Sequence, residues 1–401
     1  RVVGDEYVDE VVGEAEESAE ERFPGAKYVS VYSHKDKEMV LVPIEKALTP
    51  AFGHAIDYAS GVFEGGSVII NERTGIPNIV LLEPRNRRLF DRSLPSRDFQ
   101  SPISEEELTW AMKQLVIANG ENLFRDPDGV TPGWVRAYIR PSIHPKQLEG
   151  MGISKRDDYP IDVGILTWAW PDYLDPKMSS RGGVVAVTGK QRMEPITGKN
   201  ASNYGEAGVD SKKARWLGTD EQAYLAPYLM TKAGVPFQEY PADKWAKMAE
   251  GVMADCSGEE IAAISADHKY LVYTPMRTNR LGGTVLQYLI DGMAEKVGLI
   301  PIERDITLND LRAGKYAGLA MIGNAVEIKP VRAVYLFDEN RLAEAIELFK
   351  AYEVPEKLNV LRLRWEDETR GRIKPTFPWL LTPVSEVWDS SYAHESYGRT
   401  R

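Results

Sequence analysis

The stretch Gly198–Tyr204, which reads Gly-Lys-Asn-Ala-Ser-Asn-Tyr, decides how the rest of the chain is interpreted. Lys199 stands before small and polar residues. The Asn-Tyr pair opens a helix that we expect to continue over Ala207–Leu217 and to end near Gly218. A lysine amine becomes a nucleophile for aldehydes when desolvation or nearby cations lower its pKa. Because most lysines are solvated surface groups, this stretch alone favours an ordinary surface lysine, and the surrounding motifs must decide.

The composition limits the class of protein. The chain has 401 residues, of which 43% are hydrophobic, enough for a large core and two or three domains. A formal net charge of -11 argues against nucleic-acid binding, because phosphate contacts need a basic surface. Cys256 is the single cysteine, which suits a reducing compartment, and the sequence shows neither a long apolar run nor a signal-peptide pattern. We therefore expect a cytoplasmic protein that neither spans a membrane nor binds nucleic acid.

Shifts in composition divide the chain. Residues 1–26 form an acidic arm, and residues 170–182 form a linker rich in proline and glycine. We expect a smaller α/β domain over 27–169, a larger one over 183–365, and a C-terminal extension over 366–401. Residues 231–253 are an insertion of mixed character.

Strands are predicted where β-branched and aromatic residues gather: Tyr28–Tyr32, Met39–Pro43, Ser67–Ile70, Asn78–Glu83, Trp134–Pro141, Ile161–Trp168, Gly183–Thr188, Gln222–Leu229, Ile261–Ser265 and Tyr316–Ile322. In Trp134–Pro141 the alternation puts Arg136, Tyr138 and Arg140 on one face, which suits a polar pocket wall or the wet face of an edge strand. Helices are predicted at Pro84–Arg92, after the Ser104–Glu107 capping box, from Leu281 onward, and over Arg341–Glu353.

Three features suit the binding of a small anion. Four arginines fall within Arg85–Arg92, although a solvated helix face explains them as well. Leu281–Thr284 sets a glycine-flanked threonine at a helix N-terminus, where free N–H groups and the helix dipole favour phosphate, although a plain helix cap fits equally. Gly323–Ala325 is a second turn of small residues.

In their order along the chain these motifs resemble the class IV aminotransferases, which are pyridoxal-phosphate enzymes of fold type IV. Branched-chain amino acid aminotransferases are most similar. The resemblance covers roughly residues 30 to 332 and rests on Tyr58–Gly65, Arg88-Leu89, Tyr138–Pro141, Lys199 with Asn203-Tyr204, Leu281–Thr284, Gly323–Ala325 and Lys329–Val331. It implies a two-domain α/β (α+β) fold with pyridoxal 5'-phosphate at the domain interface, and a homodimer.

The resemblance also implies roles for single residues. Lys199 would be the catalytic Schiff-base lysine, and Tyr204 would hydrogen-bond the phenolic oxygen of the cofactor. Arg88 would bind the cofactor phosphate together with the two turns, Gly283, Thr284, Asn324 and Ala325. The substrate would be bound by Tyr58, Phe63, Tyr138, Arg140 and Trp170. No metal site is expected.

A carboxylate against the pyridine nitrogen would keep that nitrogen protonated and the ring an electron sink. The family pattern matches Asp255 to this role, with Glu250 as a rival if the insertion follows it. Glu260 stands where the family has asparagine, and Asn324 where it has threonine.

The resemblance implies transamination between a branched-chain or other hydrophobic amino acid and a 2-oxo acid. Two alternatives stay open. The chain resembles lyases and D-amino acid or amine transaminases of specialised biosynthesis at this level, and it could also be a non-catalytic relative of the fold.

Overall fold

The structure is a computed structural model that describes residues 22–47, 54–127, 135–146, 160–171, 177–191, 198–226, 251–338 and 341–386. Most of the predicted acidic arm and of the 231–253 insertion lies outside these residues, and so does Glu250. The domain limits stay predictions, because the linker is described only in part. No helix in the described ranges has the length and apolarity needed to cross a membrane.

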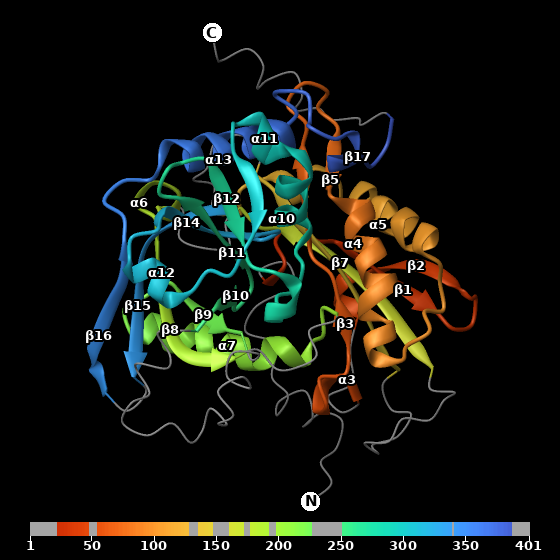
Figure 1. Ribbon diagram of the computed structural model, residues 1–401. Coiled ribbons are helices and arrows are strands. Elements are labelled where there is room, and N and C mark those ends of the chain that lie inside the picture. Colours follow the sequence, from red (N-terminus) through yellow and green to blue (C-terminus); the bar gives the residue numbers. More distant parts are fainter. Residues whose placement is uncertain are drawn as a thin grey trace, which may run out of the picture.

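The first sheet is antiparallel and follows the order β17-β5-β4-β6-β7-β1-β2, with β3 paired to β6. Its strands are β1 (Tyr28–Ser33), β2 (Glu38–Pro43), β3 (Val62–Phe63), β4 (Gly66–Ile70), β5 (Pro77–Val80), β6 (Ala137–Pro145), β7 (Ile161–Ala169) and β17 (Leu381–Pro383). Helices α4 (Leu82–Arg88) and α5 (Glu105–Asn119) lie beside it in Figure 1. The capping box at the start of α5 is confirmed, since Ser104 and Glu107 exchange side-chain to backbone hydrogen bonds.

The second sheet mixes parallel and antiparallel pairs in the order β10-β9-β8-β15-β14-β11-β12-β13, with β16 paired to β15. Its strands are β8 (Gly183–Gln191), β9 (Glu221–Leu225), β10 (Met253–Cys256), β11 (Glu260–Ser265), β12 (Tyr270–Tyr273), β13 (Ile300–Glu303), β14 (Tyr316–Gly323), β15 (Glu327–Asp338) and β16 (Arg341–Lys350). The helices are α6 (Met178–Arg181), α7 (Ser202–Trp216), α10 (Thr284–Tyr288), α11 (Ala294–Lys296), α12 (Leu308–Arg312) and α13 (Glu356–Thr369).

The helix predicted over Arg341–Glu353 is wrong, because this segment forms strand β16. Its pairing with the edge of the twelve-residue β15 buries Leu348 and Phe349. A short apolar pattern fits both periods, so the available partner strand decides between them. The helix of this region is α13, which begins further on at Glu356.

The strand predicted over Asn78–Glu83 is too long. Leu81 has a φ of +54°, which ends β5 at Val80, and α4 begins at Leu82. Pro84 is then the third helical residue, where its missing N–H would have had no partner within the helix.

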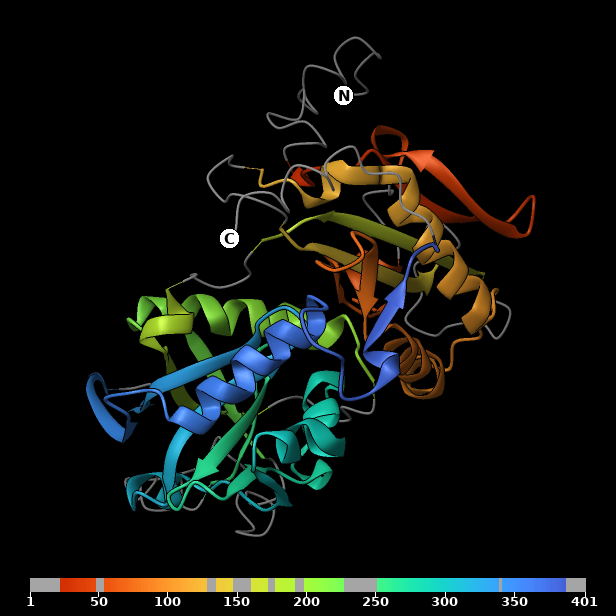
Figure 2. The same ribbon diagram turned by 90° about the horizontal axis from the view of Figure 1, so that it is seen from above.

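The two sheets are joined through a shared core and through the C-terminal segment. Strand β17 returns from α13 to pair with β5, as Figure 2 shows where the blue strand reaches the orange ones. Apolar side chains of both parts pack together below it, including Ile69, Leu81, Leu286, Leu361 and Trp365. This shared core fixes the two sheets around the space between them.

Candidate active site

A cavity of about 440 Å³ lies between the two sheets. Residues from the sides of both sheets line it. Along the chain, Lys199 follows the lining residues of the first side and precedes those of the second. All predicted site residues except Tyr58 line this cavity: Phe63, Arg88, Tyr138, Arg140, Trp170, Lys199, Tyr204, Asp255, Gly283, Thr284, Asn324 and Ala325. Tyr58 follows the short helix α3 (His54–Asp57), and its side chain is 39% exposed. Its predicted role in the substrate pocket therefore stays a prediction.

Backbone contacts on both sides fix Lys199. Its N–H donates to Ser93 Oγ at 2.9 Å, and its carbonyl accepts from the N–H of Phe63 in β3 at 3.1 Å. A Cβ at Gly198 would lie 2.5 Å from Ser93 Cα, so only glycine allows the chain to approach the Leu89–Ser93 turn this closely. The lysine is thus tied to the first sheet although α7 follows it directly.

The amine of Lys199 has a polar and an apolar neighbour. Its Nζ donates to Tyr204 Oη at 2.5 Å, and it lies 5.0 Å from the centre of the Phe63 ring. Tyr204 belongs to the first turn of α7, which begins at Ser202, so the predicted helix that opens at the Asn203-Tyr204 pair is confirmed to within one residue. The two reactive groups therefore face each other because the chain turns into a helix between them.

Arg88 makes a buried ion pair that the sequence did not predict. Its Nε and Nη2 donate to the two oxygens of Glu64, each at 2.7 Å, and its Nη1 donates to the carbonyl of Gly282 at 3.0 Å. Burial by itself lowers the pKa of Arg88, but the Glu64 carboxylate and its hydrogen bonds outweigh burial and raise that pKa. Glu64 is part of the Tyr58–Gly65 motif, yet nothing in the local pattern named Arg88 as its partner.

Two turns from distant parts of the second sheet meet beside Arg88. Gly283 is the N-cap of α10 and provides no side-chain cap, so a ligand can take the free N–H groups of this helix end. Asn324 Nδ2 donates to Thr284 Oγ1 at 3.4 Å, and the Asn324 carbonyl accepts from Ser67 Oγ at 3.2 Å. Both turns that were predicted to bind an anion therefore come together at one end of the cavity.

Acidic residues lie close to these turns. Asp255 is 1% exposed and accepts from the N–H groups of Cys256 at 3.1 Å and Leu281 at 3.3 Å. Glu260 Oε1 accepts from Arg280 Nη1 at 2.5 Å, whereas its Oε2 is buried without a hydrogen-bond partner in the described part of the chain. A Cβ at Gly283 would come within 2.3 Å of that Oε2, so a larger residue there would have to displace the Glu260 carboxylate. No local pattern in the sequence indicated that Arg280 would neutralise Glu260.

On the other side of the cavity, aromatic rings surround the Arg140 guanidinium. The Arg140 guanidinium carbon lies 5.2 Å from the ring centres of Phe63 and Tyr138, and 5.6 Å from that of Trp168. Trp170 packs edge-on against Tyr138 with ring centres 4.5 Å apart. Within the described ranges no hydrogen bond or ion pair engages the Arg140 guanidinium, and its Nε is buried. This wall combines apolar surface with a cation that a carboxylate can approach.

Two serines complete the lining near Asp255 and were also not predicted. Ser211 on α7 and Ser257 after β10 have hydroxyl oxygens 2.7 Å apart, and both donate to Glu221 Oε1. Burial raises the pKa of Glu221, and the hydrogen bonds from the serines oppose that shift. The cluster links α7 to β9 beneath the cavity.

No protein-family model and no curated protein matches the sequence. Solved structures do match it, and branched-chain amino acid aminotransferases are among them. At about one-fifth sequence identity this likeness shows the fold, which is the expected fold type IV arrangement of two sheets with helices.

Three of these structures illustrate the match. The aminotransferase of Escherichia coli superposes with a TM-score of 0.68 at 21% identity, covering 90% of this chain and 100% of that one. The enzyme of Thermoproteus uzoniensis, solved with norvaline, gives 0.68 at 22% identity, over 89% of this chain and 99% of that one. The enzyme of Thermobaculum terrenum, in its holo-form with pyridoxal phosphate, gives a TM-score of 0.67 at 19% identity, over 90% of this chain and 99% of that one.

Proposed function

We propose that the protein is a pyridoxal-phosphate-dependent aminotransferase. It would exchange an amino group between a branched-chain or other hydrophobic amino acid and a 2-oxo acid. The observation that carries the proposal is the Lys199 amine, 2.5 Å from the Tyr204 hydroxyl, in a cavity that also contains Arg88 and the buried Asp255. The neighbours with pyridoxal phosphate and with norvaline support it.

The donor set of the cavity fits this cofactor. Arg88, Thr284, Asn324 and the N-terminus of α10 would hold its phosphate, because they offer a cation and neutral donors at one end. Glu260 adds a carboxylate beside that end, but Arg280 balances its charge at 2.5 Å. Asp255, which lines the cavity, would be the carboxylate that faces the ring nitrogen of the cofactor.

When bound, pyridoxal phosphate supplies a carbonyl carbon that reacts with amines and an electron-poor ring that delocalises negative charge. Lys199 Nζ would take a proton from the substrate Cα as a general base and give it up again as a general acid. Tyr204 Oη orients that amine through its hydrogen bond. The Asp255 carboxylate holds a proton on the ring nitrogen by its negative charge.

The aromatic wall sets the substrate class. Phe63, Tyr138 and Trp170 present apolar surface to a hydrophobic side chain and exclude water from it. Arg140 would bind a substrate carboxylate, because its guanidinium lines the cavity beside the Phe63 and Tyr138 rings and has no ion-pair partner in the described ranges. A homodimer in the cytoplasm is part of the same proposal, following the resemblance and the single cysteine.

Replacing Lys199 tests the proposal most directly. Lys199→Ala should abolish the visible absorbance of protein incubated with pyridoxal phosphate. It should also lower turnover with norvaline and 2-oxoglutarate by about 10³-fold, within the range of a lost general base. Lys212→Ala, on the exposed side of α7, is the matched control and should keep both. Retained turnover in Lys199→Ala would contradict the assignment.

The same assay separates the alternatives. A panel of L- and D-amino donors and amines should favour hydrophobic L-amino acids. Turnover only with D-amino acids or amines would move the protein to that group. A wild-type protein that stays colourless with pyridoxal phosphate would instead favour a non-catalytic relative of the fold.

A further inference from the structure

We propose that Arg136 is a positioning residue, whose guanidinium holds the Gly323–Ala325 turn against Trp170. The phosphate side and the substrate side of the cavity would thereby keep a fixed separation. The inference rests on the proposed function, because it concerns the binding of that cofactor and that substrate. Arg136 itself does not belong to the cavity lining.

On the first sheet Arg136 holds Trp170 twice. Its carbonyl accepts from the N–H of Trp170 at 3.0 Å, and its Nε donates to the Trp170 carbonyl at 3.1 Å. Trp170 in turn packs against Tyr138 and Trp168, with ring centres 4.5 and 5.4 Å apart. One residue therefore fixes the backbone from which this part of the substrate wall projects.

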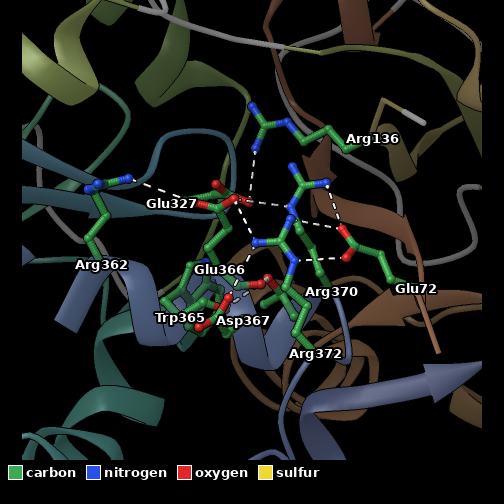
Figure 3. Close-up of polar contacts among 10 residues, drawn as sticks. Glu72, Arg136, Glu327, Arg362, Trp365, Glu366, Asp367, Arg370 and Arg372 are labelled. Atoms are coloured by element: carbon green, nitrogen blue, oxygen red, sulfur yellow. Dashed lines mark hydrogen bonds and ion pairs between the residues drawn. The ribbon is translucent and has the colours of Figure 1, made fainter. Parts of the chain in front are cut away.

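The same guanidinium reaches the second sheet. Its Nη2 donates to the carbonyl of Ala325. Its Nη1 lies 3.7 Å from Glu327 Oε1, and Figure 3 shows these two side chains. Glu327 has a φ of +61°, a conformation that residues other than glycine seldom adopt and that needs support from its surroundings. The contact therefore holds the turn at a place where its own backbone is strained.

Arginine is the residue that can make this set of contacts. Its planar fork carries five donors, so one group can serve two carbonyls and a carboxylate at once, whereas a lysine amine is a single point. The Arg136 side chain is only 10% exposed, so water cannot easily replace a lost partner. The predicted strand Trp134–Pro141 placed Arg136 on the face of Tyr138 and Arg140, and in the structure Arg136 lies just before β6 begins at Ala137.

A second arginine offers a matched control, because it also joins the two sheets. Arg372 donates to both oxygens of Glu72 at 2.8 and 2.9 Å and lies 3.3 Å from Glu366 and from Asp367 (Figure 3). None of these residues lines the cavity. A variant of Arg372 therefore loosens the junction of the sheets without touching a turn of the site.

The experiment compares Arg136→Gln, Arg136→Lys and Arg372→Gln in the full chain. Pyridoxal phosphate is titrated into each protein and its dissociation constant is read from the visible absorbance. KM and kcat for norvaline are then measured. Arg136→Gln should weaken cofactor binding and raise KM by about tenfold each, the effect of one lost charged hydrogen bond, with kcat within threefold of wild type.

Arg136→Lys keeps the charge and should recover less than half of the lost affinity on a logarithmic scale. Arg372→Gln should leave both constants within twofold of wild type, even if its melting temperature falls as much as that of Arg136→Gln. Arg136→Gln and Arg136→Lys proteins that bind cofactor and norvaline as the wild type does would overturn the inference alone. If Arg136→Gln does not fold, wild-type constants in Arg136→Lys overturn it. A wild-type protein that binds no pyridoxal phosphate would overturn the proposed function and this inference with it.

Discussion

The two sheets meet at an inner and an outer junction, and both are built from arginine and glutamate. At the inner junction Arg88 pairs with Glu64 on the side of the first sheet and Arg280 pairs with Glu260 on the side of the second, and these four side chains are 1 to 6% exposed. The hydrogen bond from Arg88 Nη1 to the Gly282 carbonyl, at 3.0 Å, crosses from one side to the other. At the outer junction Arg372 and Arg370 meet Glu72, with side chains 34 to 40% exposed (Figure 3). The closest distances are alike, at 2.5 to 2.8 Å, so distance does not separate the two sets.

Burial and the number of partners separate them. Each inner guanidinium has one carboxylate, and water cannot replace it, so the pair fixes the position of the cavity turns. Arg372 instead contacts three carboxylates in reach of solvent, and the hydrogen bonds that it donates to Glu72 raise its pKa. Arginine–carboxylate pairs therefore fix the position of the cavity turns at the inner junction. At the outer junction they form a solvated link in which one partner can replace another.

The largest effect is expected from removing the inner carboxylate. Glu64→Gln leaves the Arg88 cation buried with no charge to balance it, which should lower the free energy of unfolding by about 3–5 kcal/mol. Urea unfolding measures this loss. Glu72→Gln is the outer counterpart, and equal losses in the two variants would show that burial does not distinguish the junctions.

A smaller effect, of opposite sign, is expected at Arg85. This arginine lies one helical turn before Arg88, and its Nη1 occupies the place of a side chain at Gly66, where a Cβ would lie 1.2 Å away. Its Nη2 is buried with no hydrogen-bond partner in the described ranges, and burial lowers the pKa of Arg85 to about 10. Arg85→Met should therefore leave stability unchanged or raise it by about 1 kcal/mol, as replacing a poorly compensated buried charge can do.

The sign of the pKa shift gives this prediction its pH dependence. A guanidinium with a lowered folded-state pKa is unfavourable while it is protonated, so its penalty is full at neutral pH and is relieved only as pH rises through about 10. The gain from Arg85→Met should be constant from pH 6 to 9 in urea unfolding. A loss of more than 2 kcal/mol would instead show that the Arg85 charge is balanced in the folded protein, as the Arg88 charge is by Glu64.

The smallest effect is expected at the outer junction. Arg372→Gln should cost under about 1 kcal/mol, because exposed ion pairs contribute little and Arg370 remains near Glu72. The difference from wild type should vanish near 1 M salt, where the screening length is about 3 Å. Unfolding measured at low and high salt checks this, and a salt-independent loss would make the outer link resemble the inner one.

Local structure followed from local sequence in many places. The capping box at Ser104 and the strands β1, β2, β4 and β7 appear where β-branched and apolar patterns predicted them. The segment of β16 did not, because its pattern suits both periods until β15 offers an edge. Strand β17 also escaped prediction, since its three residues gain their structure only from pairing with β5.

The sequence by itself determined the order of the motifs, the lysine five residues before Tyr204, and the small turns around Thr284 and Asn324. Each of these depends on neighbours within a few residues. Only the tertiary structure decided that Glu64 balances Arg88, that Arg280 balances Glu260, and that Arg136 connects Trp170 to Ala325. These partners lie 20 to 189 residues apart in the chain, and a charge selects its partner by burial and reach in space, which no local pattern records.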